Sequence, residues 1–267
     1  APDTGRAQSL SRTMLQLLGL LALVWLGLCL LLFLLQRSLI YFPAPGAPGS
    51  AASSFWLESP QARLRISARR QLAGATAIVY FGGNAEDVAS TLPDLSAQFP
   101  DHALFLMHYR GYGGSSGRPS EAALVDDALA LFDEVHRWHP EVVVIGRSLG
   151  SGVAVQLAAQ RPVQRLVLVT PFDSLRAVAQ RLYPWVPVGW LLHDRFESDA
   201  LAPSLRMPTR LIVAGRDEVV DPAHARRLYE AFAPGIARLD EVPKAGHNDI
   251  SEHPSYAALL QDAVTGP

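Results

Sequence analysis

Apolar side chains form one long run near the start of the sequence. Residues 14–35 contain no charged side chain, and Gln16 is the only strongly polar one among them. At about 1.5 Å per helical residue this segment spans roughly 33 Å, which matches a bilayer hydrocarbon core of about 30 Å. The pattern therefore predicts a membrane-spanning helix over residues 14–35, preceded by a short flank of residues 1–13.

A cleaved signal peptide is the main alternative for this run. Its apolar region usually has only about 7–15 residues, so the length favours an uncleaved anchor. A lipid-modified Cys29 is disfavoured because Leu28 precedes it, where a small residue is expected. Arg6 and Arg12 precede the run and Arg37 follows it. This bias of one positive charge predicts a single-pass protein whose main domain lies outside the cytoplasm.

A stretch rich in Pro, Gly and Ala follows the apolar run. Residues 43–50 read PAPGAPGS and have no apolar periodicity, a composition typical of a linker. We expect residues 36–52 to tether the anchor to one domain. That domain is expected to comprise residues 53–267, a segment long enough for a single α/β core.

Short apolar runs alternate with longer amphipathic stretches through the expected domain. The stretch 120–138 places Leu124 and Val135 on one helical face, with Ser120 as N-cap and with Asp126 and Asp127 facing water. Most of the short runs are apolar throughout, as strands covered on both faces are. The alternation predicts a mostly parallel sheet with flanking helices, in the α/β class. The expected strands are 76–81, 103–108, 142–145, 165–170, 209–214 and 237–242, with an antiparallel pair at 55–58 and 64–68.

Residues 171–208 interrupt the alternation. This stretch is rich in aromatic side chains and contains several prolines that prevent a long helix. An aromatic insertion between two strands predicts a small cap over a pocket. For each aromatic residue taken singly, simple packing of the cap onto the domain is the favoured interpretation.

Composition and charge exclude several classes of protein. The 267 residues are 49% hydrophobic and 18% charged, which is incompatible with a disordered chain. Lys and Arg number 23 against 25 Asp and Glu, a formal charge of −2, and the basic residues are scattered. Nucleic acid is therefore not an expected partner. The single cysteine, Cys29, excludes an intramolecular disulfide and a cysteine-based zinc site, and we expect neither a metal nor a cofactor.

The sequence GRSLG at residues 146–150 carries the first chemical signal. It follows the apolar run VVVI and precedes the helix-compatible run VAVQLAAQ. A serine at a sharp strand-to-helix turn needs small residues two positions before and after it, and Gly146 and Gly150 meet that need. The pattern predicts Ser148 as a nucleophile, with the backbone N–H of Leu149 as one oxyanion donor.

A serine hydroxyl becomes nucleophilic when a histidine, oriented by a carboxylate, takes its proton. In folds with this turn the chain order is serine, acid, histidine. Asp217 directly follows the run TRLIVAG, and His247 follows the last expected strand. Asp221 is a less favoured acid because it precedes Pro222 and resembles a helix N-cap.

The second oxyanion donor is expected in the turn after strand 76–81. There Gly82, Gly83 and Asn84 allow close backbone approach, and the helix that follows supplies free N–H groups. We assign the role to the backbone N–H of Asn84. An ordinary strand-to-helix turn is the alternative, because such turns often contain glycine and asparagine.

Five stretches together resemble the serine hydrolases of the α/β-hydrolase fold. They resemble in particular a membrane-anchored group that includes protein depalmitoylases and lysophospholipid or acylglycerol lipases. The resemblance implies Ser148 as nucleophile, Asp217 as acid and His247 as base. Two features depart from the group: Gly82 stands where histidine is common, and a membrane helix replaces a cysteine-rich N-terminus. The stretches are YFGGNAEDV (80–88), YRGYGGSSGRPSE (109–121), GRSLGSGVA (146–154), GRDEVVD (215–221) and AGHNDI (245–250).

These observations favour a membrane-anchored serine hydrolase that cleaves esters or thioesters with an apolar acyl chain. The aromatic cap and the anchor favour lipid-like substrates. An aminopeptidase-like amide hydrolase is the main alternative, with Glu86 and Asp87 as the nearest acidic pair for a substrate amine. A catalytically silent scaffold on the same fold is the second alternative.

Overall fold

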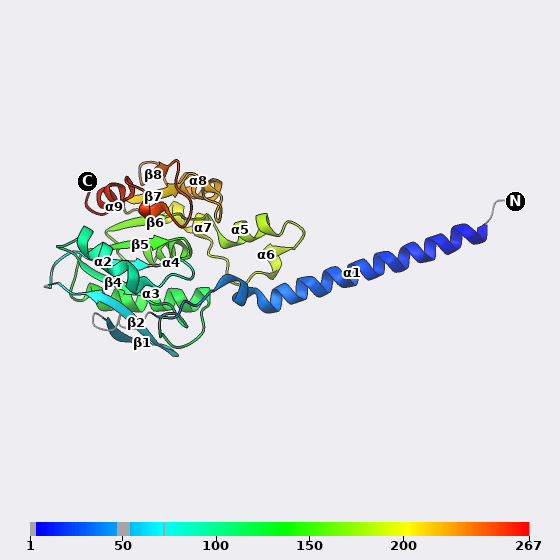
Figure 1. The fold of residues 1–267 in the computed structure, drawn as a ribbon, viewed down its shortest axis with the longest axis horizontal. Helices are drawn as coiled ribbons and strands as arrows, with labels where there is room; N and C mark the ends of the chain where they lie inside the picture. Colours follow the sequence, from blue (N-terminus) through cyan, green and yellow to red (C-terminus); the bar gives the residue numbers. More distant parts are fainter. Residues whose placement is uncertain (1–3, 47–53, 72, 267) are drawn as a thin grey trace.

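The computed structural model describes residues 4–46, 54–71 and 73–266. The helix α1 (Thr4–Ile40) projects far from a domain built around one sheet (Figure 1). Its segment Arg12–Ile40 is long and apolar enough to cross a membrane. The helix continues five residues beyond the expected end of the span, so residues 36–40, expected in the tether, are helical. Residues 41–46 of the expected linker are described and form neither helix nor strand, and residues 47–52 lie outside the described residues.

The sheet has eight strands in the order β1-β2-β4-β3-β5-β6-β7-β8. The β1–β2 and β2–β4 pairs are antiparallel, and all the remaining pairs are parallel. The predicted α/β class, with a mostly parallel sheet, is therefore confirmed. The strands are β1 (Ser54–Ser59), β2 (Ala62–Arg69), β3 (Ala77–Phe81), β4 (Ala103–Met107), β5 (Val142–Arg147), β6 (Arg165–Val169), β7 (Thr209–Ala214) and β8 (Ala237–Val242).

Helices cover both faces of the sheet. Alternate residues of β5 point to opposite sides: Val144 joins one apolar cluster with α3, α4 and α8, and Val143 joins the other with α2 and α9. Strands covered on both faces are apolar throughout, which is why the sequence revealed them. The helices are α2 (Val88–Gln98), α3 (Glu121–His136), α4 (Leu149–Ala158), α5 (Leu175–Leu182), α6 (Val188–Leu191), α7 (Ser198–Leu201), α8 (Pro222–Ala231) and α9 (Tyr256–Thr265), with short 3₁₀ turns at Ala202–Ser204 and Ile250–Glu252.

The helix α3 follows its predicted pattern except at one residue. Ser120 caps it, because its side chain accepts a hydrogen bond from the N–H of Ala123 at 3.3 Å. The expectation that Asp127 faces water is wrong, since Asp127 is fully buried. It accepts two hydrogen bonds from Arg110, at 2.7 and 2.8 Å. The loop after β4 thus supplies a cation that the helical periodicity of α3 could not reveal.

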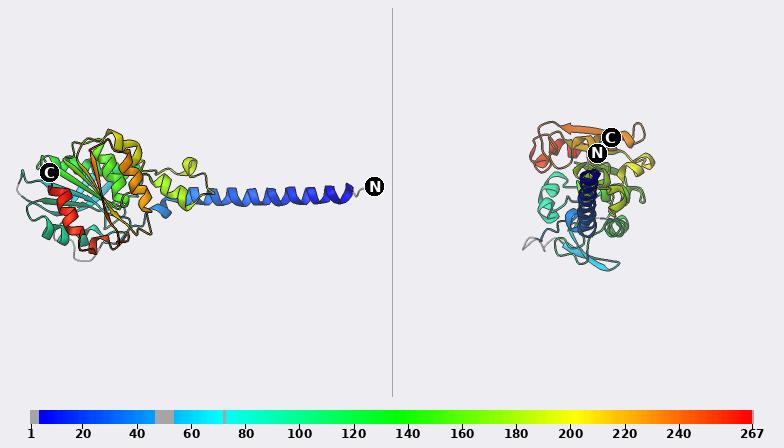
Figure 2. Two further views of the ribbon diagram at one scale, coloured as in Figure 1. Left: turned by 90° about the horizontal axis from the view of Figure 1, so that it is seen from above. Right: turned by 90° about the vertical axis from the view of Figure 1, so that its right-hand side faces the viewer.

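The short helices α5 and α6 lie between β6 and β7 in the chain and extend beside the end of α1 that joins the domain (Figures 1 and 2). Trp25 donates a hydrogen bond from Nε1 to the carbonyl oxygen of Trp185 at 3.0 Å. Cys29 is buried against Val186 and Val188. The insertion after β6 therefore packs against α1 as well as against the domain.

Candidate active site

Ser148 lies at the turn between β5 and α4, with φ +49° and ψ −115°. A non-glycine residue at positive φ typically costs about 1–3 kcal/mol and is held there by its surroundings. A Cβ on Gly150 would lie 2.1 Å from the carbonyl oxygen of Phe81, and one on Gly146 would lie 2.4 Å from that of Gly150. Only glycine fits at both positions, so the close approach of helix to strand presents the serine at the end of β5.

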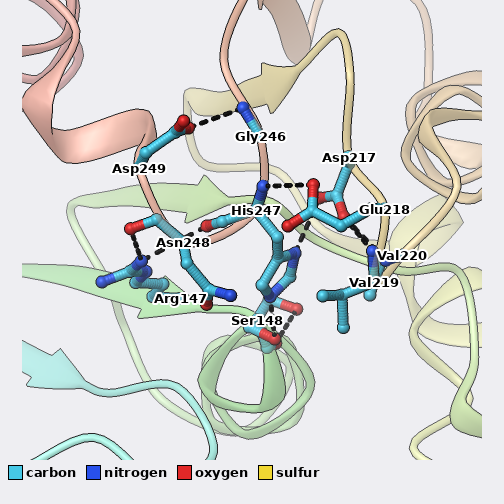
Figure 3. Close-up of polar contacts among 11 residues, drawn as sticks. Arg147, Ser148, Asp217, Glu218, Val219, Val220, Gly246, His247, Asn248 and Asp249 are labelled. Carbon is cyan, nitrogen blue, oxygen red and sulfur yellow. Dashed lines mark hydrogen bonds and ion pairs between the residues drawn. The ribbon is translucent and has the colours of Figure 1, made fainter.

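Three side chains that are distant in the sequence form a hydrogen-bonded chain (Figure 3). The Nε2 atom of His247 lies 2.9 Å from Ser148 Oγ, and its Nδ1 atom lies 2.7 Å from Asp217 Oδ2. The second oxygen of Asp217 accepts hydrogen bonds from the N–H groups of Val219 at 2.9 Å and Val220 at 2.7 Å. The carboxylate is 2% exposed and the imidazole 7%. The arrangement orients the imidazole with one nitrogen toward the serine.

The alternative acid, Asp221, has a different place. Its side chain caps α8 by accepting a hydrogen bond from the N–H of Ala223 at 2.8 Å. It also pairs with Arg181 of α5. The hydrogen bond from the N–H of Ala223, and to a lesser extent the nearby charge of Arg181, hold the pKa of Asp221 below its ordinary value. Asp217, not Asp221, is the carboxylate in contact with His247.

The turn after β3 is held by the side chains of Glu86 and Asn84. Glu86 accepts hydrogen bonds from the N–H of Gly83 at 2.7 Å and from Tyr80 and Thr91, both at 2.8 Å. A Cβ on Gly82 would lie 2.5 Å from Val88 Cγ1. A histidine there would therefore require a shift of Val88, which gives a structural reason for the departure at this position.

Asn84 connects this turn to the end of α1. Its Nδ2 donates to the carbonyl oxygen of Ile40 at 2.5 Å, and its Oδ1 accepts from the N–H of Phe42 at 2.9 Å and from Tyr112 at 2.8 Å. Asn84, Ser148 and Leu149 all line one cavity. Leu149 is the first residue of α4, so its N–H has no acceptor within the helix.

That cavity has a volume of about 370 Å³. None of the described residues that line it is charged, and most come from α1, from α5 and α6, and from the loop after β7. Phe172 lies in its wall and is buried, in line with the packing expected for the aromatic residues of 171–208. Trp190 does not follow that expectation, because it is 90% exposed.

The acidic pair considered for a substrate amine has structural roles instead. Glu86 holds the turn after β3, and Asp87 caps α2 through the N–H of Ala89 at 3.2 Å. Neither side chain is among the described residues that line the cavity. Across the described part of the chain, no group of three or more His, Cys, Asp or Glu could hold a metal ion.

The sheet order and the serine at a glycine-flanked strand-to-helix turn define an α/β hydrolase. A family model described as "alpha/beta hydrolase fold" matches residues 77–200. Over 251 residues, 88% of each chain, the sequence is 36% identical to the protein Rv2307c of Mycobacterium tuberculosis. The chain belongs to the α/β-hydrolase family.

Two further comparisons bear on the fold and the anchor. The chain is 32% identical over 169 residues, 60% of each protein, to the Saccharomyces cerevisiae membrane protein YNL320W. The Pyrococcus furiosus esterase Pf2001 superposes with a TM-score of 0.66 at 16% identity, over 84% of this chain and 98% of that one. At this identity the second likeness concerns the fold alone.

Proposed function

We propose that the protein is a serine hydrolase that cleaves esters or thioesters of apolar acyl groups. The observation that carries the proposal is the chain of hydrogen bonds from Asp217 through His247 to Ser148, which ends at an uncharged cavity. Ser148 acts as nucleophile, His247 as base and Asp217 as the group that orients the imidazole.

The reaction has two halves. Ser148 Oγ attacks the carbonyl carbon while His247 Nε2 takes the hydroxyl proton, and the same proton then passes to the departing alcohol or thiol. Water next attacks the acyl-enzyme with His247 as base, and the free carboxylic acid leaves as Ser148 regains its proton. The carboxylate of Asp217 stabilises the imidazolium in both halves and is not itself protonated.

The backbone N–H groups of Leu149 and Asn84 hold the negative charge that develops on the carbonyl oxygen. The first turn of α4 adds the positive end of the helix dipole. Loss of one such donor in related chemistry costs about 10²–10³ in kcat. Water, the three side chains of the proposed triad and these amides are sufficient for the reaction, so the proposal requires no cofactor.

The cavity determines the class of substrate. Its volume of about 370 Å³ lies at the lower end of the range for small-molecule sites, roughly 300–1,000 Å³. An uncharged lining offers no partner for a phosphate or an ionised amine, whereas it favours an aliphatic chain. The fit therefore supports a lipid-like acyl group over an amino-acyl group as the substrate.

In this proposal the anchor determines where the protein is located in the cell. Residues 14–35 cross the membrane and residues 53–267 form the catalytic domain, outside the cytoplasm, with residues 171–208 as its cap. External protease should digest the domain in intact cells or spheroplasts. Complete protection of the domain would indicate the opposite orientation in the membrane and would leave the proposed reaction unchanged.

A fluorophosphonate probe tests the nucleophile. The wild-type full chain should be labelled, and Ser148→Ala should not be labelled. Ser255→Ala is the matched control, because Ser255 is exposed at the start of α9. Equal labelling of Ser148→Ala and wild type would refute the mechanism. Faster cleavage of an amino-acyl anilide than of p-nitrophenyl butyrate would instead indicate an amide hydrolase, and no turnover of either would indicate a silent scaffold.

A further inference from the structure

The cavity beside Ser148 is bounded on one side by α1. Five residues near the end of that helix line it: Leu32, Phe33, Gln36, Leu39 and Ile40. Their spacing of three, four and seven places them on one face of the helix. Four of the five are less exposed than the rest of the helix, since Leu32, Phe33 and Ile40 are half-buried and Gln36 is buried, whereas Leu39 remains 48% exposed.

Polar contacts hold this face of α1 against the cap. Gln36 donates to the carbonyl oxygen of Leu191 at 3.3 Å and accepts from the N–H of His193 at 2.8 Å. The next residue, Arg37, and Tyr41 just beyond the helix both donate to Asp194, at 3.2 and 3.0 Å. A helix that only tethered the domain would not need these contacts.

The same end of α1 is joined to the oxyanion turn. The side chain of Asn84 binds the carbonyl oxygen of Ile40 and the N–H of Phe42. The wall of the cavity and the proposed oxyanion donor are therefore fixed to one another. A shift of the helix relative to the domain would disturb both.

We propose that α1 is the inner wall of the acyl-binding pocket, and that the acyl chain of an ester in the bilayer lies along it with the carbonyl at Ser148. This inference rests on the function proposed above. From Ile40 to Leu32 the helix rises about 12 Å. An extended chain of single bonds advances about 1.2 Å per bond, so this wall accommodates an acyl chain of about ten carbons.

The position of α1 also indicates where the acyl chain comes from. The pocket face of α1 continues directly into the apolar segment of the helix, and the hydrogen bond from Trp25 to Trp185 brings the cap beside that segment. The cap also exposes apolar and aromatic side chains: Leu182 is 64% exposed and Trp190 is 90% exposed. An acyl chain in the same membrane can therefore enter the pocket without crossing water.

A chain-length series tests the wall in the full-length protein, reconstituted in phosphatidylcholine vesicles. Leu32→Trp fills the far end of the pocket, while Leu34→Trp makes the same change on the opposite, 69% exposed face. Leu32→Trp should lower kcat/KM for p-nitrophenyl dodecanoate by about tenfold or more relative to kcat/KM for the butyrate ester. Leu34→Trp should change neither. Identical chain-length profiles for the two variants would overturn the proposal.

The experiments distinguish a wrong proposal about the α1 wall from a wrong proposal about hydrolase activity. If fluorophosphonate labels Ser148 and butyrate is cleaved but the profiles coincide, only the wall is refuted. If wild type is neither labelled nor active, the hydrolase is refuted, and binding then tests the wall. A dodecanoic acid carrying a terminal diazirine should photolabel an α1 peptide in wild type and much less in Leu32→Trp. Absence of α1 labelling in wild type would overturn the wall in either case.

Discussion

Asn84→Ala should slow catalysis although it keeps the backbone N–H proposed to bind the oxyanion. The substitution removes the side chain that joins the oxyanion turn to the end of α1. Three hydrogen bonds to residues outside the turn are lost: from Asn84 to Ile40 at 2.5 Å, from Phe42 at 2.9 Å and from Tyr112 at 2.8 Å. Glu86 still binds the N–H of Gly83, but the N–H of residue 84 is then held less firmly in its position relative to Ser148.

The size of the effect has two bounds. A typical hydrogen bond contributes about 0.5–1.5 kcal/mol net, so the three contribute roughly 1.5–4.5 kcal/mol to holding the turn. Complete loss of one oxyanion donor costs about 2.7–4 kcal/mol, which limits the catalytic effect. Since each 1.36 kcal/mol corresponds to about a tenfold change in rate, we expect kcat to fall by about 10- to 100-fold.

Hydrolysis of p-nitrophenyl butyrate measures this effect, because a short ester does not depend on the far end of the pocket. Tyr112→Phe removes only one of the three bonds and should lower kcat by less than about tenfold. The melting temperature of each variant distinguishes a local change in the turn from a loss of overall folding. If Asn84→Ala keeps the wild-type kcat while its melting temperature falls, the turn is not positioned through α1 and the reasoning is wrong.

Three further predictions concern the triad and the buried charges. Asp217→Asn should lower kcat by about 10³–10⁴-fold, because the imidazole of His247 loses its orienting carboxylate. Asp127→Ala leaves the buried guanidinium of Arg110 unpaired and should cost about 3–5 kcal/mol of unfolding free energy, measured by denaturant titration. Burial, aided by a nearby arginine, lowers the pKa of His108 to about 4. The unfolded chain binds a proton at this residue already near pH 6.5, whereas the folded protein does not. The free energy of unfolding should therefore fall by about 3 kcal/mol between pH 6.5 and 4.

Each of these predictions has a matched control. Asp221→Asn keeps a helix cap and should retain activity, and the reverse ranking of the two variants would make Asp221 the acid. Asp133→Ala breaks an exposed pair with Arg161 and should cost at most about 1 kcal/mol. A cost equal to that of Asp127→Ala would refute the argument from burial. His108→Gln should flatten the acid limb of the stability curve, and an unchanged limb would show that other groups cause it.

The fold could be predicted because its strands are covered on both faces. β5 continues two residues beyond its expected end, because Gly146 and Arg147 still pair with Leu168 and Val169 of β6. Sequence periodicity cannot detect such pairing, since it depends on the neighbouring strand. The burial of Asp127 escaped prediction for the same reason: its partner, Arg110, comes from a different element.

The residues of the proposed triad could be located because their positions follow from local patterns. Ser148 lies between glycines that the turn requires, and Asp217 and His247 follow strand ends at the same edge of the sheet. The cavity wall could not be located in this way. A leucine that faces lipid and a leucine that faces an acyl chain have the same chemistry, so Leu32 and Leu34 look alike in the sequence. Gln36 is the signal in the sequence that points to a contact between α1 and the domain. A polar side chain at the end of an apolar run requires a hydrogen-bond partner if it is buried, and Gln36 is buried and bound by His193.

If α1 forms a wall of the pocket, the domain without α1 should differ from the full chain in reactivity and in ester preference. A chain that begins near residue 51 keeps Ser148, Asp217 and His247, but it lacks one side of the pocket and the partners of Asn84 at Ile40 and Phe42. We expect such a chain to react slowly with fluorophosphonate and to lose its preference between butyrate and dodecanoate esters. If it matched the full chain in both rate and preference, α1 would serve as an anchor alone. The apolar run would then hold the domain at the membrane and nothing more, whereas the proposed wall makes its last residues part of the substrate-binding surface.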